Sequence, residues 1–202
     1  MKVTLSLPAI ARMRIAIRLL RALSIALVVV ACTQQGPSST GSFGRDFALR
    51  DHNGKLRTLA EFRGKAVVVF FGYTQCPDVC PTTLTSLAEA MKRLGPDGDR
   101  VQVLFITVDP ERDTAALLSK YVPAFDPRFL GLRGSAEETE RTAKEFRVRY
   151  QKQPGTSLGG YTIDHSLGTF IFDPQGRLRI NARLEQGPDQ FAHDLRGLLK
   201  AG

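Results

Sequence analysis

The hydrophobic pattern of the chain alternates between short apolar runs and segments with apolar residues at helical spacing. Residues 66–71 and 101–108 are mostly apolar, which is typical of central strands that are buried on both faces. After the first run, apolar residues recur three or four positions apart, at Leu84, Leu87, Ala88, Met91 and Leu94. This spacing predicts an amphipathic helix that packs against the strands.

The segments around these elements continue the alternation. Residues 47–49 and 56–59 flank the turn Asp51-His52-Asn53-Gly54, which indicates an opening hairpin. Asp113 can cap a helix that extends to about residue 122. Ser135 and Glu138 form a capping-box pattern, which opens a helix to about residue 146.

The last third of the chain predicts further strands and a final helix. Residues 129–132 indicate a short strand, and residues 151–160 indicate a loop. Residues 168–172 and 178–182 flank the turn Asp173-Pro174-Gln175-Gly176 and predict a hairpin, and a helix begins at about residue 188. This order predicts an α/β, thioredoxin-like fold: a central mixed sheet flanked by helices, with an additional N-terminal β-hairpin.

The first 44 residues do not follow this pattern. Residues 1–31 contain five basic residues and no acidic residue, and the apolar run 22–31 ends directly before Cys32. This layout is typical of a bacterial lipoprotein signal with Cys32 as the lipidated residue. The run is shorter than the ~20 residues of a membrane-spanning helix, and an uncleaved anchor is the alternative. We therefore expect a signal peptide at residues 1–31, the lipidated cysteine and a flexible linker at residues 32–44, and one domain at residues 45–202.

The positive charge is concentrated in the same segment. The formal net charge is +8, and five of the positive charges lie in residues 1–31, which leaves +3 for the rest of the chain. The basic composition therefore gives little support for nucleic-acid binding, and we expect no nucleic-acid partner. Export also places the domain in an oxidising compartment, where a thiol pair needs a reductant or a bound metal to stay reduced.

Cys76 and Cys80 are the candidates for metal or redox chemistry. They follow the apolar run 66–71 and precede the amphipathic helix, and a helix N-terminus lowers the pKa of a thiol. Pro81 fits the first turn of that helix, so residues 76–80 are expected to form the turn that leads into it. Their CxxxC spacing is one residue longer than a thioredoxin-type CxxC and lets both sulfur atoms face one soft ion such as Cu(I). A zinc site and a plain disulfide are the alternatives.

A histidine can complete such a site. His165 lies just before a strand pattern, and a thioredoxin-like fold brings this loop beside the helix that follows the cysteines. A single histidine is nevertheless more often a surface or core residue than a ligand. His52 and His193 are expected at the surface, and Met91 is expected in the core, which excludes a methionine-rich copper site.

Three carboxylates are candidates for a supporting role. Asp164 precedes His165 and can accept a hydrogen bond from the imidazole of a metal ligand. Asp109 ends the second buried strand and can tune the site or contact a partner, although Asp-Pro is also an ordinary turn sequence. Asp78 lies between the cysteines and can steer copper or a partner. For Asp164 and Asp78, an exposed carboxylate without a function is the alternative.

Three segments resemble the signature of the Sco/SenC family. They are residues 72–81 (Gly-Tyr-Thr-Gln-Cys-Pro-Asp-Val-Cys-Pro), residues 107–114 (Thr-Val-Asp-Pro-Glu-Arg-Asp-Thr) and residues 161–166 (Tyr-Thr-Ile-Asp-His-Ser). They occur in the order of the family, and the similarity covers roughly residues 43–200. The resemblance implies a thioredoxin-like fold, export with a membrane tether, and one copper ion, Cu(I) or Cu(II), held by Cys76, Cys80 and His165.

The resemblance also implies a function and partners. Members of the family assist assembly of the CuA centre of cytochrome c oxidase, so the expected partner is the CuA-bearing subunit, with periplasmic copper carriers or thiol reductants as further partners. The expected location is the periplasmic or extracytoplasmic face of a membrane, reached through the lipid anchor at Cys32. Residues 164–168 contain no proline, whereas thioredoxins usually carry a cis-proline in that loop. This difference favours metal handling over general disulfide exchange.

Two other functions stay open. The protein can be a thiol–disulfide oxidoreductase that reduces the CuA cysteines through a redox-active Cys76–Cys80 pair without carrying metal. It can also be a copper or redox sensor that signals through a partner. In the metallochaperone function, oxidation of Cys76 and Cys80 to a disulfide removes two ligands, so the redox state gates copper binding.

Overall fold

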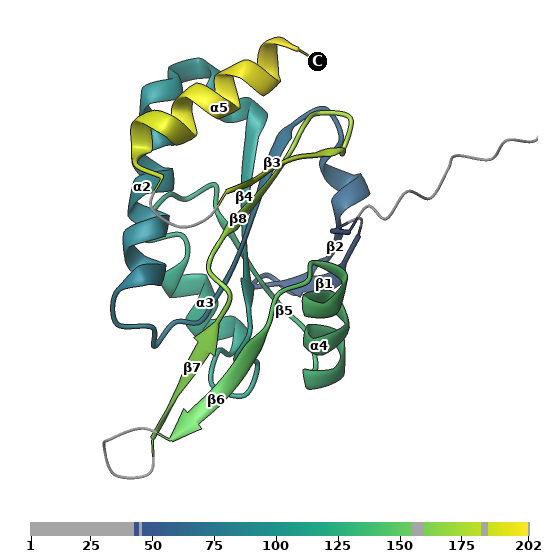
Figure 1. Cartoon of the computed structure of the whole chain (residues 1–202), viewed down its shortest axis with the longest axis vertical. Helices are drawn as coiled ribbons and strands as arrows, with labels where there is room; N and C mark the ends of the chain where they lie inside the picture. Colours follow the sequence, from purple (N-terminus) through teal and green to yellow (C-terminus); the bar gives the residue numbers. More distant parts are fainter. Residues whose placement is uncertain (1–42, 45, 155–159, 183–185, 202) are drawn as a thin grey trace, which may run out of the picture. The chain divides into compact units, whose positions relative to one another are not determined.

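The computed structural model describes residues 43, 44, 46–154, 160–182 and 186–201 (Figure 1). The predicted signal peptide, Cys32 and most of the predicted linker lie outside the described residues. The strands are β1 (Ala48–Asp51), β2 (Leu56–Thr58), β3 (Ala66–Gly72), β4 (Val101–Thr107), β5 (Leu130–Arg133), β6 (Tyr150–Pro154), β7 (Tyr161–His165), β8 (Thr169–Phe172) and β9 (Leu178–Ala182). The helices are α2 (Val79–Leu94), α3 (Ala115–Tyr121), α4 (Ala136–Glu145) and α5 (Pro188–Lys200), with 3-10 turns η2 (Leu59–Phe62) and η3 (Gly95–Arg100).

Within the described residues, a mixed sheet of seven strands has the order β2-β1-β5-β4-β3-β8-β9. Strands β3, β4 and β5 run parallel, and β8 is antiparallel to β3. The hairpin of β1 and β2 extends this sheet because β1 also pairs with β5, with Asp51 opposite Leu132. The predicted mixed sheet and N-terminal hairpin are therefore confirmed. Strands β6 and β7 form a second sheet of two strands.

The side chains of β3 alternate between two hydrophobic cores. Val68 and Phe70 belong to the core that contains residues of α2 and α5, whereas Val67, Val69 and Phe71 belong to the core that contains residues of α4. Figure 1 shows α2 and α5 together on one side of the sheet and α4 on the other. Every residue of β3 and β4 is buried because helices cover both faces, as the continuous apolar runs predict.

The predicted helices are present, with one difference that concerns the cysteines. Helix α2 begins at Val79, so Cys80 belongs to its first turn, whereas the sequence predicts that Cys80 ends the preceding turn. Helix α4 opens with the predicted capping box, in which Ser135 and Glu138 each bind the other's main-chain N–H. Among the described residues, none of the helices combines the length and the apolar character that crossing a membrane requires.

The segment after α4 differs from the prediction. The pattern predicts a loop over residues 151–160, whereas Tyr150–Pro154 form β6 and pair with β7 in antiparallel register, Tyr150 opposite His165. Most residues of β6 are polar, and all are exposed or half-buried, so neither an apolar run nor an alternating pattern marks this strand. The hairpin of β6 and β7 carries His165 at its end, and its position therefore decides where the imidazole lies.

The described end of the predicted linker contacts the domain. The main-chain N–H of Gly44 donates to the carbonyl of Glu145 at 2.8 Å. The ring of Phe43 packs edge-on against Phe170, with 6.3 Å between the ring centroids. The guanidinium carbon of Arg147 lies over the ring of Phe43, 4.6 Å from its centroid. These contacts attach residues 43 and 44 to the folded domain.

Candidate metal centre

The two cysteines are presented by the turn that joins β3 to α2. The main-chain N–H of Cys76 donates to the carbonyl of Tyr73 at 3.2 Å, and Cys80 follows in the first turn of the helix. A Cβ atom at Gly72 would lie only 2.7 Å from the Sγ atom of Cys80. Gly72 therefore leaves room for the thiol at the end of the strand. Cys80 is fully buried, Cys76 is half-buried, and both are free thiols.

Strand β7 brings His165 to these thiols. Its Nε2 atom lies 3.7 Å from the Sγ atom of Cys80, although 85 positions separate the two residues in the chain. One ligand atom from each of Cys76, Cys80 and His165 lies within 4.8 Å of the other two. The structure thus brings together the two cysteines and the histidine that the sequence singles out.

The neighbours of the imidazole determine which of its nitrogen atoms faces the thiols. The Nδ1 atom of His165 lies 3.1 Å from the carbonyl oxygen of Ser166. A carbonyl can only accept a hydrogen bond, so Nδ1 carries the proton and donates it. Nε2 then presents its lone pair toward Cys80. The ring is also in edge-on contact with Tyr73, at a centroid separation of 5.9 Å.

The pKa of the Cys80 thiol is shifted in the direction opposite to the one that the sequence predicts. The sequence predicts a lowered thiol pKa at the helix N-terminus, but burial raises the pKa of Cys80 well above its ordinary value and outweighs a hydrogen bond from the main chain of Tyr73. Burial also lowers the pKa of His165, which favours the neutral imidazole. The metal-free site therefore holds a neutral thiol at Cys80, and metal binding must displace its proton.

The three residues fit a copper ion. Two ligand atoms with metal bonds of about 2.3 Å can lie no more than about 4.6 Å apart, which is close to the separation that the donor atoms already have. Thiolates are soft ligands and suit Cu(I), and imidazole suits copper as well. Within the described ranges, no fourth cysteine, histidine or carboxylate joins this group, whereas a structural zinc site takes four ligands.

Asp109 lies inside the protein and binds residues next to the site. It is 1% exposed, its carboxylate accepts a hydrogen bond from the hydroxyl of Tyr161 at 2.7 Å, and it forms an ion pair with Arg112. Its main-chain N–H donates to the hydroxyl of Thr107 at 2.9 Å. These contacts bury the carboxylate away from any partner surface, and they leave a role in tuning the site as the remaining prediction for Asp109.

Asp164 and Asp78 are both exposed. The contact predicted for Asp164 is made by the carbonyl of Ser166, which faces Nδ1 of His165 because it follows directly in the chain. Asp78 lies at the N-cap position of α2, and the hydroxyl of Thr82 lies 3.4 Å from its carboxylate. An open hollow of about 260 Å³ lies beside the imidazole. Its lining residues are Arg149, Tyr150, Gln151, Asp164, His165 and Ser166.

Asp113 is a buried carboxylate whose role differs from the prediction. Helix α3 is capped by Thr114, and Asp113 instead accepts hydrogen bonds from the hydroxyls of Thr74 at 2.6 Å and Thr107 at 2.5 Å, and from the main-chain N–H of Thr74 at 3.1 Å. Burial raises its pKa. Asp113 thus ties the cysteine turn to the end of β4. Its position in the second sequence motif, residues 107–114, was the available signal, but its hydrogen-bond partners are set by tertiary contacts.

Met91, His193 and His52 are not part of the group formed by Cys76, Cys80 and His165. Met91 is in the core and His193 is exposed, as predicted. His52 is half-buried rather than a plain surface residue, because its Nδ1 atom accepts the main-chain N–H of Gly131 at 3.1 Å.

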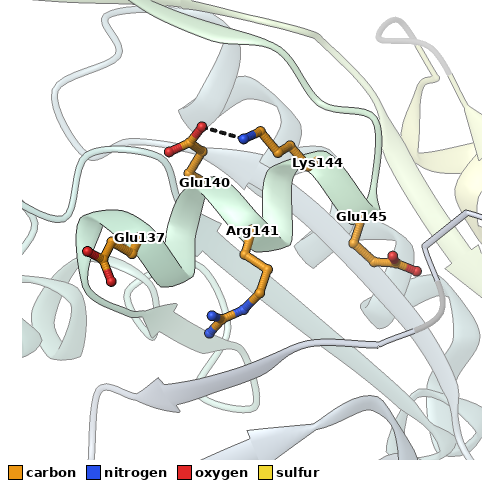
Figure 2. A pocket seen from close by; sticks show the side chains of 5 residues that line it. All are labelled: Glu137, Glu140, Arg141, Lys144 and Glu145. Atoms are coloured by element: carbon orange, nitrogen blue, oxygen red, sulfur yellow. Dashed lines mark ion pairs between the residues drawn. The ribbon is translucent and has the colours of Figure 1, made fainter.

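A second open hollow, of about 440 Å³, lies along α4 (Figure 2). It is lined by the charged residues Glu137, Glu140, Arg141, Lys144 and Glu145. Glu140 and Lys144 form an exposed ion pair one helical turn apart, at 2.6 Å. Its lining contains no thiol and no imidazole, so the hollow offers no ligand that suits a soft metal ion. The group of Cys76, Cys80 and His165 therefore remains the candidate metal centre.

Comparison with known proteins agrees with the resemblance of the three motifs. The SCO1/SenC family model matches residues 35–200. "Protein SCO2 homolog, mitochondrial" from Bos taurus is 45% identical over 133 residues, which are 65% of this chain and 50% of that protein. The "SCO2-like protein" from Rickettsia felis is 34% identical over 155 residues, which are 76% of each protein.

A solved structure is similar over most of the described domain. The structure of ScoI from Bradyrhizobium japonicum with copper bound is 40% identical and has a TM-score of 0.72, with 78% of this chain and 100% of that chain covered. The similarity confirms the predicted thioredoxin-like fold. The chain spans only half the length of the bovine relative. The family model, in contrast, covers most of the chain, including both cysteines and His165. The chain therefore belongs to the SCO1/SenC family.

Proposed function

We propose that this protein is a copper metallochaperone that binds one copper ion through Cys76, Cys80 and His165 and assists assembly of the CuA centre of cytochrome c oxidase. The observation that carries the proposal is the convergence of the three donor atoms within 4.8 Å in a member of the SCO1/SenC family. The copper-bound structure of the related ScoI supports copper as the metal.

Copper is the cargo in this function, and the protein residues hold and release it. Binding requires the thiolate forms of Cys76 and Cys80, so their protons leave when the metal enters. The Nδ1–H group of His165 donates a hydrogen bond to the carbonyl of Ser166, and this bond keeps Nε2 directed at the ion. Transfer proceeds by ligand exchange. Because Cys76 and His165 are half-buried and Cys80 is fully buried, partner thiolates replace the first two ligands before Cys80.

The proposed partner is the CuA-bearing subunit of the oxidase, with periplasmic copper carriers or thiol reductants as upstream partners. The carboxylates of Asp78, between the two cysteines, and of Asp164, next to His165, are exposed and can contact such partners. The hollow beside His165 leaves space for an incoming ligand at the imidazole. In this proposal Asp109 tunes the site from inside the protein, which its burial and its contacts with Tyr161 and Arg112 support.

The proposed location is the periplasmic or extracytoplasmic face of a membrane. Residues 1–31 act as a lipoprotein signal in this proposal, Cys32 carries the lipid, and residues 33–44 provide the linker to the domain at residues 45–202. A lipid anchor is consistent with the apolar run of ten residues, which is shorter than a membrane-spanning helix. In the same compartment, oxidation to a Cys76–Cys80 disulfide removes two copper ligands.

A thiol–disulfide oxidoreductase is the second candidate function. It is favoured by the two free thiols at the N-terminus of α2 in a thioredoxin-like fold. In this function the dithiol reduces a disulfide of the CuA subunit: two thiols are oxidised to the Cys76–Cys80 disulfide, and two partner thiols form. His165 is not needed as a ligand for that reaction.

One transfer experiment separates the two functions. The copper-loaded protein is mixed with the reduced, metal-free CuA domain, and in parallel the metal-free dithiol protein is mixed with the oxidised CuA domain. A metallochaperone transfers copper in the first mixture, and His165→Ala lowers the amount transferred. A reductase produces partner thiols in the second mixture at a rate that His165→Ala leaves unchanged, whereas Cys→Ser at either cysteine abolishes it. No copper transfer together with fast thiol production would overturn the metallochaperone function.

A further inference from the structure

The guanidinium of Arg112 connects three segments that surround the metal centre. Its Nε atom forms an ion pair with the carboxylate of Asp109, which follows β4. Its Nη1 atom donates to the side-chain carbonyl of Gln75 at 3.1 Å and to the main-chain carbonyl of Tyr161 at 2.8 Å. Gln75 is the neighbour of Cys76, and Tyr161 is the first residue of β7. One side chain therefore joins the cysteine turn, the end of β4 and the strand that carries His165.

Tyr161 is held at several points by this arrangement. The guanidinium carbon of Arg112 lies 3.6 Å from the centroid of the Tyr161 ring, and the Tyr161 hydroxyl donates to Asp109 at 2.7 Å. Asp109 is itself fixed, because it is buried and its main-chain N–H is bound by Thr107 of β4. The ion pair has a side-chain exposure of 20% at Arg112 and 0% at Asp109, so it is shielded from solvent far more than an ordinary surface pair.

Tyr73 extends the same set of contacts to the imidazole. The Arg112 guanidinium carbon lies 5.7 Å from the centroid of the Tyr73 ring. The Tyr73 hydroxyl accepts the main-chain N–H of Ile163 at 3.3 Å, and the Tyr73 ring meets the ring of His165 edge-on. Strand β7 is thus contacted at its first, middle and last residues by side chains from outside the hairpin.

These contacts matter because, in the part of the chain that the structure describes, no strand pairing joins the hairpin to the main sheet, so side chains attach it to the domain. The buried Ile163 and the ion pair of Lys152 with Glu111 contribute as well. Within the described residues, β6 and β7 form their own two-stranded sheet and share no ladder with the seven-stranded sheet. An isolated two-stranded hairpin is at best marginally stable in water. The position of His165 relative to the two cysteines therefore depends on the contacts that fasten the hairpin to the rest of the domain.

We propose that Arg112 is a positioning residue for the metal centre: with Asp109 and Tyr161 it fastens the β6–β7 hairpin to the cysteine turn, so that His165 meets Cys76 and Cys80. The inference rests on the proposed function, because it assigns to Arg112 an effect on copper binding that acts through His165. Arg112 itself does not touch the metal. Lysine cannot replace it, because the contacts use the planar guanidinium both as a two-nitrogen donor and as a stacking surface.

A double-mutant cycle tests the proposal on the full chain. Copper affinity is measured by anaerobic competition titration for the parent, Arg112→Gln, His165→Ala and the double variant. We expect Arg112→Gln to weaken copper binding about tenfold when His165 is present, as the loss of a supporting contact does at other metal sites. In the His165→Ala background the same change should alter affinity less than about twofold, because the residue that Arg112 positions is gone.

Matched variants separate positioning from general destabilisation. Arg128→Gln removes another arginine that is paired with a buried aspartate, Asp126, and should leave copper affinity unchanged. Tyr161→Phe keeps the ring under the guanidinium and loses only the hydrogen bond to Asp109, so it should fold and weaken copper binding less than Arg112→Gln. In the metal-free protein, amide hydrogen exchange should become faster at Ile163 in Arg112→Gln and stay slow in β3.

The outcomes distinguish this inference from the proposed function. If His165→Ala alone leaves copper affinity unchanged, both the proposed site and the positioning role fail. If His165→Ala weakens binding but Arg112→Gln has the same effect in both backgrounds, or has no effect on copper affinity, the site stands and the positioning role of Arg112 is overturned. Unchanged exchange at Ile163 would likewise contradict the fastening of the hairpin by Arg112.

Discussion

The Nε2 atom of His165 lies 3.7 Å from the Sγ atom of Cys80. The contact joins the end of β7 to the first turn of α2, and Cys76 completes a group whose donor atoms lie within 4.8 Å of one another. The three donor atoms therefore lie close to the arrangement that binding of one ion requires.

Substitution of Gly72 should disturb the buried cysteine. In Gly72→Ala, the new Cβ atom would lie 2.7 Å from the Sγ atom of Cys80 and 2.9 Å from the ring of Phe105. Overpacking of this kind costs about 1–3 kcal/mol of stability, and displacement of Cys80 should also weaken copper binding. Urea denaturation and a copper titration measure the two effects.

Gly197→Ala is the matched control for this change. Gly197 lies within α5, and a Cβ atom there would meet no atom within 4 Å. Alanine in a helix is favoured over glycine by about 1 kcal/mol, so this variant should be at least as stable as the parent and bind copper equally well. Equal stability and copper affinity for Gly72→Ala and Gly197→Ala would show that the close approach of Cys80 to Gly72 has no consequence.

Oxidation should remove copper binding reversibly. A Cys76–Cys80 disulfide leaves His165 as the single remaining ligand of the proposed site, because the thiolate is the form that binds metal. We expect the oxidised protein to retain no stoichiometric copper after desalting, and treatment with a thiol reductant to restore one copper per chain. Comparable copper retention by the oxidised and reduced forms would contradict ligation by the two thiolates.

The buried carboxyl of Asp113 should make stability depend on pH. Burial raises its pKa above the ordinary value, although hydrogen bonds from Thr107 and Thr74 oppose the rise. The protonated form is then favoured more in the folded than in the unfolded protein. Its contribution to stability is therefore fully present below the unfolded-state pKa and is lost as the pH rises through the raised folded-state pKa.

Asp113→Asn removes this titration while keeping most of the shape. Urea denaturation at about pH 4 and about pH 7 should show that the parent loses stability relative to the variant as the pH rises. A stability difference that stays constant, or that changes in favour of the parent at the higher pH, would mean that burial does not raise the pKa of Asp113.

The parts of the fold that sequence could predict are those with strong local signals. The apolar runs of β3 and β4 and the capping box of Ser135 and Glu138 mark their elements directly, and these predictions are confirmed. Strand β6 was missed because its residues are polar and it pairs only with β7, so no hydrophobic pattern distinguishes it from a loop.

In the candidate metal centre, too, the sequence predicts the features with a local signal and not those that depend on tertiary packing. The spacing of Cys76 and Cys80 and the three motifs identify the three candidate ligands before any contact is known. The raised pKa of Cys80 could not be predicted, because helix position is local and argues for a lowered value, whereas burial depends on packing. The side-chain contacts of Arg112 also come from segments far apart in the chain and became visible only in the structure.

An anaerobic copper titration of the reduced protein beside its His165→Ala variant tests the central claim most directly. We predict one tightly bound copper per chain in the parent and an affinity at least about tenfold lower in the variant, because one of three ligands is lost. His193→Ala, which changes an exposed histidine outside the site, should bind copper like the parent. Copper binding that is weak in the parent, or equally tight in His165→Ala, would contradict a metal centre formed by Cys76, Cys80 and His165.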